Sequence, residues 1–126
     1  MRLVIDMQGA QTASRDRGIG RYTLSLVRWL IQIAEHHEVI LFINAALREG
    51  ADALIAEFRR LVPREQIIVF EPMPPLSFSA VGNRARVLAM EPIREAMLVD
   101  LEPDVVLLTS LFEGYQDDAL TSVGAY

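Results

Sequence analysis

The chain has 126 residues and a formal net charge of -5 at pH 7, and its 12 basic residues are all arginines. A chain of this length suits one compact domain with a single hydrophobic core. The negative charge and the lack of lysine argue against a nucleic-acid binder, because such proteins hold phosphates with clustered basic side chains. The chain also has no cysteine, which excludes disulfides and cysteine-ligated metals and favours a cytoplasmic location.

Hydrophobic residues make up 52% of the chain, and the mean hydropathy is +0.25. That content is high for a small domain, so we expect a partner domain or subunit to cover part of the apolar surface. No segment approaches the roughly 20 apolar residues that a membrane-spanning helix needs, and the first residues lack the pattern of a secretion signal.

Four short apolar runs predict buried β-strands. Each run is nearly continuous rather than alternating, which is typical of parallel strands covered on both faces. The runs are residues 2–7, 38–43, 66–70 and 104–108.

A first helix is predicted from Ile19 to Glu35, because its polar residues recur three or four positions apart and form one solvated stripe. The stripe consists of Arg21, Ser25, Arg28, Gln32 and Glu35. The remaining apolar side chains are expected to pack on the sheet. They include Tyr22, Leu26, Trp29, Leu30 and Ile33.

Two further helices are predicted. One spans Ala51 to Leu61, and its inward face consists of Leu54, Ile55, Phe58 and Leu61. The other spans residues 82–101 and is expected to be interrupted at Pro92, where it should kink or restart, because proline has no N–H to donate to the helix.

The alternation of strands and helices predicts an α/β fold, a three-layer Rossmann-like doubly wound parallel sheet with strand order 3-2-1-4. Such sheets bind ligands beyond the carboxyl ends of their strands, next to the switch between the first and fourth strands. The loops 8–18, 71–81 and 109–115 leave these ends. The second loop is expected to expose Met73, Leu76 and Phe78, as a lid, as a hydrophobic acceptor site or as an ordered connector.

The segment RDRGIGRY, residues 15–22, places Gly18 and Gly20 at the start of the first helix. The pair comes too late after the first strand for a dinucleotide fingerprint, and Thr23 stands where the third glycine belongs. Backbone amides at a helix start do suit an anion. Three guanidinium groups flank the loop and would suit a diphosphate or an acidic sugar: those of Arg15, Arg17 and Arg21. The alternative is that the glycines serve only the turn and the helix entry, with the last arginine simply exposed.

Two carboxylates follow the first and fourth strands. If these strands are neighbours, Asp6 and Glu113 face one cleft. Such a pair could act as acid and base or could bind sugar hydroxyls. For Asp6, an inward carboxylate that caps loop amides is an equal alternative.

The opening MRLVIDMQGAQTASRDRGIGRYTLSLV and the closing EPDVVLLTSLFEGYQDDALTSVG resemble the N-terminal domain of glycosyltransferase family 4, retaining enzymes of the GT-B fold with two Rossmann-like domains. Within that family the chain looks most like the mannosyltransferases of bacterial polysaccharide and O-antigen assembly. The resemblance covers essentially the whole chain but only the first half of such an enzyme. It implies that residues 1–126 form the acceptor-side domain and that the C-terminal donor domain lies outside the chain.

The resemblance also implies site residues. The loop after the first strand faces the donor diphosphate in that family, which implies Gly18 and Gly20 with Arg21 nearby. The loop after the fourth strand lines the sugar side of the cleft, where Asp6, Arg15 and Arg17 are also expected. Its residues are Ser110, Phe112, Glu113 and Gly114. The family's histidine near the end of the fourth strand is absent, because Leu107, Leu108 and Thr109 stand there.

The full enzyme is expected to move a sugar, with mannose as the candidate, from a nucleoside diphosphate sugar to a glycan or lipid-linked glycan acceptor. No metal or other cofactor is expected, and the fragment alone should be inactive. Its expected partners are its own C-terminal domain and the acceptor, with peripheral contact to a membrane-linked acceptor. Two alternatives remain: a stand-alone flavodoxin-like binding or regulatory module, and a nucleotide-sugar epimerase, against which the missing glycine fingerprint argues. Reading the gene beyond Tyr126 separates them.

Overall fold

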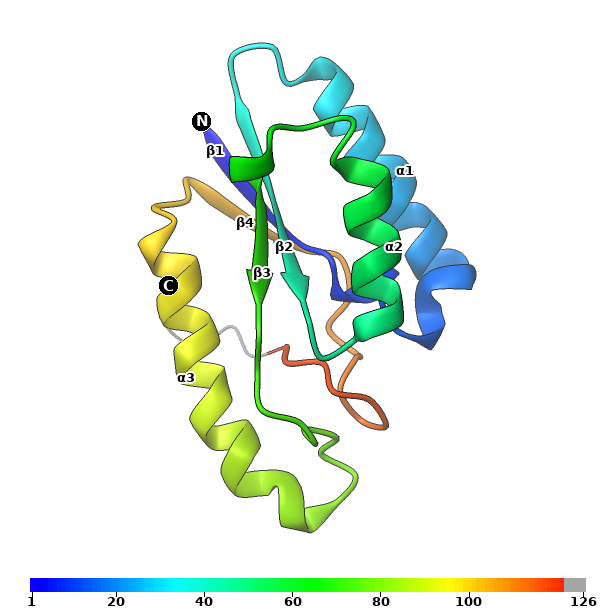
Figure 1. Cartoon of the computed structure of the whole chain (residues 1–126), viewed down its shortest axis with the longest axis vertical. Helices are drawn as coiled ribbons and strands as arrows, with labels where there is room; N and C mark the ends of the chain where they lie inside the picture. The colour runs from blue at the N-terminus through cyan, green and yellow to red at the C-terminus, as the bar shows by residue number, and fades with distance from the viewer. Residues whose placement is uncertain (122–126) are drawn as a thin grey trace.

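A computed structural model describes residues 1–121 of the chain. Within these residues it forms a four-stranded parallel sheet in the order β3-β2-β1-β4 (Figure 1). The predicted fold class and strand order are therefore confirmed. The strands are β1 (Arg2–Asp6), β2 (Glu38–Asn44), β3 (Ile67–Phe70) and β4 (Val105–Leu108).

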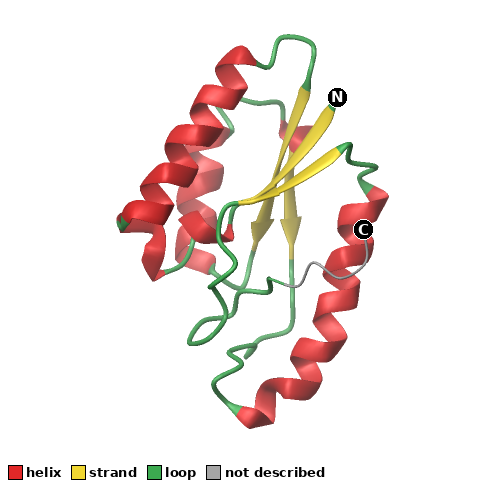
Figure 2. Ribbon diagram, turned by 180° about the vertical axis from the view of Figure 1, so that it is seen from behind, coloured by secondary structure: helices red, strands yellow, loops and turns green. Residues whose placement is uncertain are grey.

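Helices cover both faces of the sheet and complete three layers (Figure 2). On one face lie α1 (Gly18–Ile33) and α2 (Arg48–Phe58), and on the other lies α3 (Arg84–Asp100). Short 3-10 helices precede several of these elements: η1 (Gln8–Ala10), η2 (Ala13–Asp16), η3 (Arg64–Gln66) and η4 (Val81–Asn83). No helix within residues 1–121 is long and apolar enough to cross a membrane.

The core consists of two clusters, one on each face of the sheet. Successive residues of β1 alternate between them: Val4 packs towards α3, whereas Ile5 packs towards α1 and α2. Because both faces are covered, most positions of such a strand are apolar. This explains why the sequence shows continuous rather than alternating runs.

The α1 helix turns a different side towards the sheet than predicted. The solvated stripe is exposed as expected, but the buried residues are Gly20, Thr23 and Val27. The prediction that the large residues pack on the sheet was wrong for three of them, because small side chains let the helix lie close to the sheet and leave bulkier ones on its flank. These are Tyr22, Trp29 and Ile33, with exposed fractions of 57%, 56% and 49%.

Two other residues were predicted on the wrong side of the surface. Leu61 is 50% exposed because α2 ends at Phe58, and Val62 takes the buried place in the following turn. Leu76 is fully buried against the α3 face rather than exposed, and its amide donates to the Asp118 carboxylate at 2.7 Å.

The expectation that the helix restarts at Pro92 was wrong. The α3 helix runs without a break from Arg84 to Asp100 and contains Pro92. The proline side chain is exposed, so its ring displaces no packed neighbour. In the loop 71–81, the predicted exposure of Met73 and Phe78 is confirmed, since their exposed fractions are 65% and 54%.

Candidate functional site

The loops 8–18, 71–81 and 109–115 form one rim at the carboxyl ends of the strands, and we call them the carboxyl-end rim. Side-chain hydrogen bonds join its last loop to the first loop and to α1, beside the neighbouring strands β1 and β4. The Thr12 hydroxyl donates to the Glu113 carboxylate at 2.8 Å, and the Thr23 hydroxyl donates to that of Thr109 at 2.8 Å. The structure thus brings together the two motifs from opposite ends of the chain.

Glu113 holds this junction. It is 6% exposed, and its second carboxylate oxygen accepts the Ser110 hydroxyl at 3.0 Å. The Thr12 hydroxyl also accepts the Ser14 amide at 3.2 Å and so caps η2. Both carboxylate oxygens of Glu113 are therefore engaged in ordering the rim.

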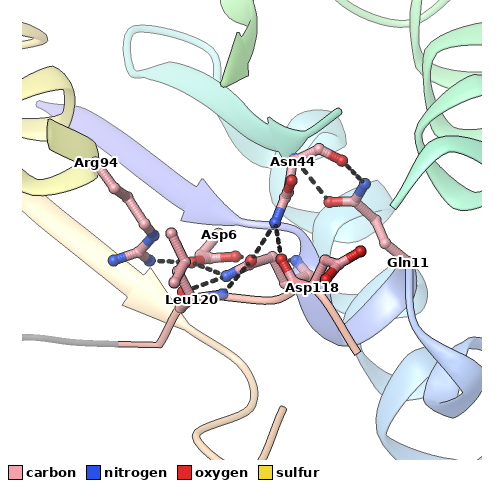
Figure 3. Close-up of polar contacts among 7 residues, drawn as sticks. Asp6, Gln11, Asn44, Arg94, Asp118 and Leu120 are labelled. Carbon is pink, nitrogen blue, oxygen red and sulfur yellow. Dashed lines mark hydrogen bonds and ion pairs between the residues drawn. The ribbon is translucent and has the colours of Figure 1, made fainter. Parts of the chain in front are cut away.

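Asp6 lies in a separate network, shown in Figure 3. It is 4% exposed and forms an ion pair with Arg94 of α3, itself 1% exposed. The carboxylate also accepts the backbone and side-chain N–H groups of Gln8, at 2.9 and 3.0 Å. Asp6 therefore caps a loop amide and connects β1 to α3, and within residues 1–121 its hydrogen bonds and ion pair do not include Glu113.

Amide side chains continue this network past the ends of β1 and β2 (Figure 3). Gln8 donates to the Leu120 carbonyl at 2.6 Å and accepts from Asn44 at 2.8 Å. Gln11 exchanges two hydrogen bonds with the Asn44 backbone, at 2.8 and 3.0 Å. Sequence reasoning missed these residues. The available signal was that Gln8 and Asn44 each come directly after a predicted apolar run, whereas Gln11 has no such signal.

The two glycines of the first motif differ in their surroundings. A Cβ on Gly20 would lie under 3.0 Å from backbone atoms of Ser14 and Arg15, whereas one on Gly18 would meet open space. Gly20 is thus required by the close approach of η2. Gly18 lies at an exposed helix start whose cap residue, Arg17, makes no side-chain capping bond.

The three arginines of this motif differ in their contacts. Arg15 bonds the Glu49 carboxylate of α2 at 2.8 Å, and this hydrogen bond lowers the pKa of Glu49 below its ordinary value. Arg17 and Arg21 are exposed beside the start of α1. Arg15 and Glu49 instead border an open depression of about 470 Å³, which Arg48 also lines.

The other two loops of the rim are joined through their backbones. The Phe78 amide donates to the Gly114 carbonyl and the Ser79 amide to the Tyr115 carbonyl, each at 3.0 Å. The rings of Phe78 and Tyr115 meet edge to face with their centres 5.4 Å apart. Phe112 projects from this pair of loops with 93% of its surface exposed, so the rim ends in an aromatic surface.

Asp117 lies at the base of the last loop. Its carboxylate accepts the Gly114 and Ala119 amides at 2.8 and 3.1 Å. Burial raises the pKa of Asp117 above its ordinary value, and these two hydrogen bonds oppose that effect. Within residues 1–121, no three His, Cys, Asp or Glu side chains are grouped as a metal ion would require.

Comparison with known proteins gives three relatives. The chain is 31% identical over 126 residues to an Escherichia coli protein named serotype-specific mannosyltransferase WbdA, covering 99% of this chain and 15% of that protein. Two further E. coli proteins of the same name are 27% and 26% identical over 99 residues, covering 78% of this chain and 12% of each. No family model and no solved structure matches the chain.

These matches confirm the resemblance to bacterial mannosyltransferases that the two end motifs indicated, while the assignment to glycosyltransferase family 4 stays a prediction. The similarity extends through the strands, helices and rim described above. The chain spans only 15% of the length of the first of these relatives. It is related, along nearly its whole length, to one segment of a bacterial mannosyltransferase.

Proposed function

We propose that this chain is the acceptor-side domain of a retaining, metal-independent glycosyltransferase of the GT-B fold. The complete protein moves a sugar, with mannose as the candidate, from a nucleoside diphosphate sugar to a glycan or lipid-linked glycan acceptor. The observation that carries this proposal is the 31% identity over 99% of the chain to a named mannosyltransferase. The donor domain lies outside the chain, and the fragment by itself does not catalyse transfer.

The start of α1 supplies the electrostatic part of this proposal. When a diphosphate departs from a sugar, negative charge develops on it, and preorganised N–H groups and arginines stabilise that charge. We assign this role to the amides at Gly18 and to the guanidinium groups of Arg17 and Arg21, because all three residues are exposed at the start of α1. Gly20 contributes by letting η2 pack against the helix start.

The rest of the carboxyl-end rim is assigned to the sugar side of the cleft. Glu113 fixes the positions of Thr12 and Ser110, and Arg15 with its partner Glu49 presents charged groups that can bind sugar hydroxyls. Asp6 supports the rim indirectly, because its ion pair with Arg94 holds α3 against the sheet. We assign Phe112, which is 93% exposed, and the aromatic surface around it to the apolar part of a lipid-linked acceptor, in peripheral contact with a membrane on its cytoplasmic side.

An activity assay of the complete protein tests this proposal. Incubated with nucleoside diphosphate mannose and a glycan acceptor, it should form a product whose anomeric configuration, read by NMR, matches that of the donor. The double variant Arg17→Gln/Arg21→Gln should lower kcat by about 100-fold, as the loss of such donors commonly does. Arg60→Gln, an exposed arginine just after α2, serves as the matched control. Absence of transfer from every nucleoside diphosphate sugar would contradict the proposal.

A further inference from the structure

The start of α3 and the loop before it form an apolar surface at one end of the molecule. Both project beyond the carboxyl ends of the strands (Figure 1 and Figure 2). Four large hydrophobic side chains of this region are between 54% and 87% exposed. Together with two arginines that lie among them in the sequence, we call them the α3 tip. The residues of the α3 tip are Met73, Phe78, Val81, Arg84, Arg86 and Leu88.

The first turns of α3 have an inner and an outer side. Val87 and Met90 pack against the core cluster on this face of the sheet. Val81, Arg84 and Leu88 are spaced three and four positions apart, so they share one side of the helix start, and all three are exposed. The outer side of the helix start therefore presents two large hydrophobic side chains to solvent with a cation between them.

Hydrogen bonds and prolines order the backbone of the α3 tip. The Asn83 side-chain amide donates to the Ser77 carbonyl at 2.8 Å, and the Arg86 guanidinium donates to the Pro75 carbonyl at 3.0 Å. The loop 71–81 also contains three prolines, which restrict its backbone further. Because the exposed side chains are carried by an ordered backbone, docking them together costs less conformational entropy.

The charge of this region is opposite in sign to that of the whole chain. Residues 72–90 contain two arginines and no acidic residue, whereas the net charge of the chain is -5. In the adjoining segment after β4, Glu113 is 6% exposed and the Asp118 carboxylate accepts a loop amide. At the other end of the sheet, Glu102 and Asp104 are exposed. The described part of the chain thus has a basic apolar end and an acidic opposite end.

We propose that the α3 tip docks on the surface of a bilayer that contains anionic phospholipids. Val81 and Leu88 insert between the headgroups, and Arg84 binds their phosphates. Surfaces that combine exposed apolar side chains with basic ones bind such bilayers, because apolar burial and attraction to anionic headgroups act together. An acidic or neutral bilayer-facing surface would lack the second contribution.

The α3 tip is continuous with the aromatic surface of the carboxyl-end rim, since the rings of Phe78 and Tyr115 are in contact. A bilayer bound at the tip therefore lies beside Phe112, which we assign to a lipid-linked acceptor. The inference extends the membrane contact of the proposed function by naming the docking surface and the charge of the lipid. It rests on the surface alone and does not require that the complete protein transfers a sugar.

Co-sedimentation of the 126-residue chain with lipid vesicles tests this proposal. The chain should bind vesicles of phosphatidylcholine mixed with phosphatidylglycerol at least about 10-fold more tightly than vesicles of phosphatidylcholine alone, and added salt should weaken that binding. Val81→Ser/Leu88→Ser should lower the affinity for the mixed vesicles by at least about 10-fold, because less apolar area is inserted. Arg84→Gln should lower it by about 5-fold, while Arg84→Lys keeps the charge and most of the affinity.

The matched controls lie at the opposite end of the molecule. Ile33→Ser/Leu61→Ser replaces two side chains that are 49% and 50% exposed, and Arg59→Gln removes an exposed charge. Both controls should leave vesicle binding unchanged, and circular dichroism verifies that each variant is folded. Vesicle binding needs neither donor nor acceptor, so its failure is distinct from a failure of the proposed transfer activity.

Three results would overturn the inference. Equal affinity for the two kinds of vesicle, or binding to neither, would exclude docking on anionic lipid. Control variants that weaken binding as much as the tip variants would show that the α3 tip is not the docking surface. A dimer in analytical ultracentrifugation that Val81→Ser/Leu88→Ser dissociates would assign the tip to a second copy of the chain instead.

Discussion

Gly20 tolerates no side chain, because a Cβ there would meet backbone atoms that cannot move independently of η2. We expect Gly20→Ala to lower the free energy of unfolding by about 1–3 kcal/mol, as overpacking does. Gly18→Ala is the matched control at the same helix start, where the added methyl meets open space. It should be neutral or stabilise by up to about 1 kcal/mol. Urea titration of both variants measures the difference, and equal midpoints would contradict the account of Gly20.

Asp117 should make stability depend on pH. Burial raises its pKa above 3.8 in the folded chain, so the folded state holds this proton more tightly than the unfolded state. The resulting stabilisation is fully present below the unfolded pKa and is lost as pH rises through the raised folded pKa. Asp117→Asn cannot titrate there and should gain stability relative to the native chain as pH rises from about 4 to 7. Urea unfolding of both chains at several pH values tests this. If the free energy of unfolding of Asp117→Asn fell relative to that of the native chain as pH rose, the expectation would be contradicted.

At the level of elements, the ion pair between Asp6 and Arg94 connects β1 to α3 through the interior. Asp6→Asn removes the charge that pairs with the buried Arg94 guanidinium, and we expect a loss of about 3–5 kcal/mol. Arg94→Met in addition removes the second charge of the pair and should recover part of that loss. A double-mutant cycle by urea unfolding measures the coupling, which should exceed about 1 kcal/mol. If the effects of the two single substitutions on the free energy of unfolding were additive, the ion pair would not be what connects β1 to α3.

Pro92 is an exposed proline within α3 and leaves one helical hydrogen bond unmade. Pro92→Ala restores an N–H donor and removes the clash of the ring with the preceding turn, so it should stabilise the chain by about 2 kcal/mol. Ala96→Gly, also exposed on α3, should destabilise by about 1 kcal/mol. Thermal unfolding compares the two, and a Pro92→Ala variant that melts below the native chain would contradict the expected gain.

The same elements show what the sequence could predict. The apolar runs and the spacing of Arg21 to Gln32 identified strands, helix and solvated stripe, because those patterns are local. Periodicity did not decide which apolar sector of α1 meets the sheet. Val27 and Trp29 are both apolar, and only the approach of the sheet makes the smaller one the buried one.

At the level of the whole molecule, the strand order was predictable because handed crossovers leave few arrangements of strands and helices. The networks at the carboxyl ends were not. Asp6 meets Arg94 from 88 positions away, and Thr12 meets Glu113 from 101 positions away. Contacts of this kind form only when the sheet has assembled, so no pattern within a short stretch of sequence predicts them.

The whole chain should bind nucleoside diphosphate sugars only weakly. In our proposal its carboxyl-end rim offers amides and arginines to a diphosphate, while the contacts to the base and to the donor sugar belong mainly to the donor domain. We expect a Kd weaker than about 1 mM, corresponding to less than about 4 kcal/mol of binding free energy. Isothermal titration of residues 1–126 measures it. A micromolar Kd would mean that this domain binds the donor by itself, and it would contradict the proposal that a second domain supplies most donor contacts.

The backbone of the segment after β1 lies against the starts of two helices. Gly20 of α1 lies against Ser14 and Arg15, and Gly50 of α2 lies against Gln11 in the same way. The segment therefore works as a spacer of fixed length between the two helices. Exchanging its exposed side chains leaves that spacing intact, whereas inserting a single residue between Gln11 and Arg15 would displace both helices from the sheet.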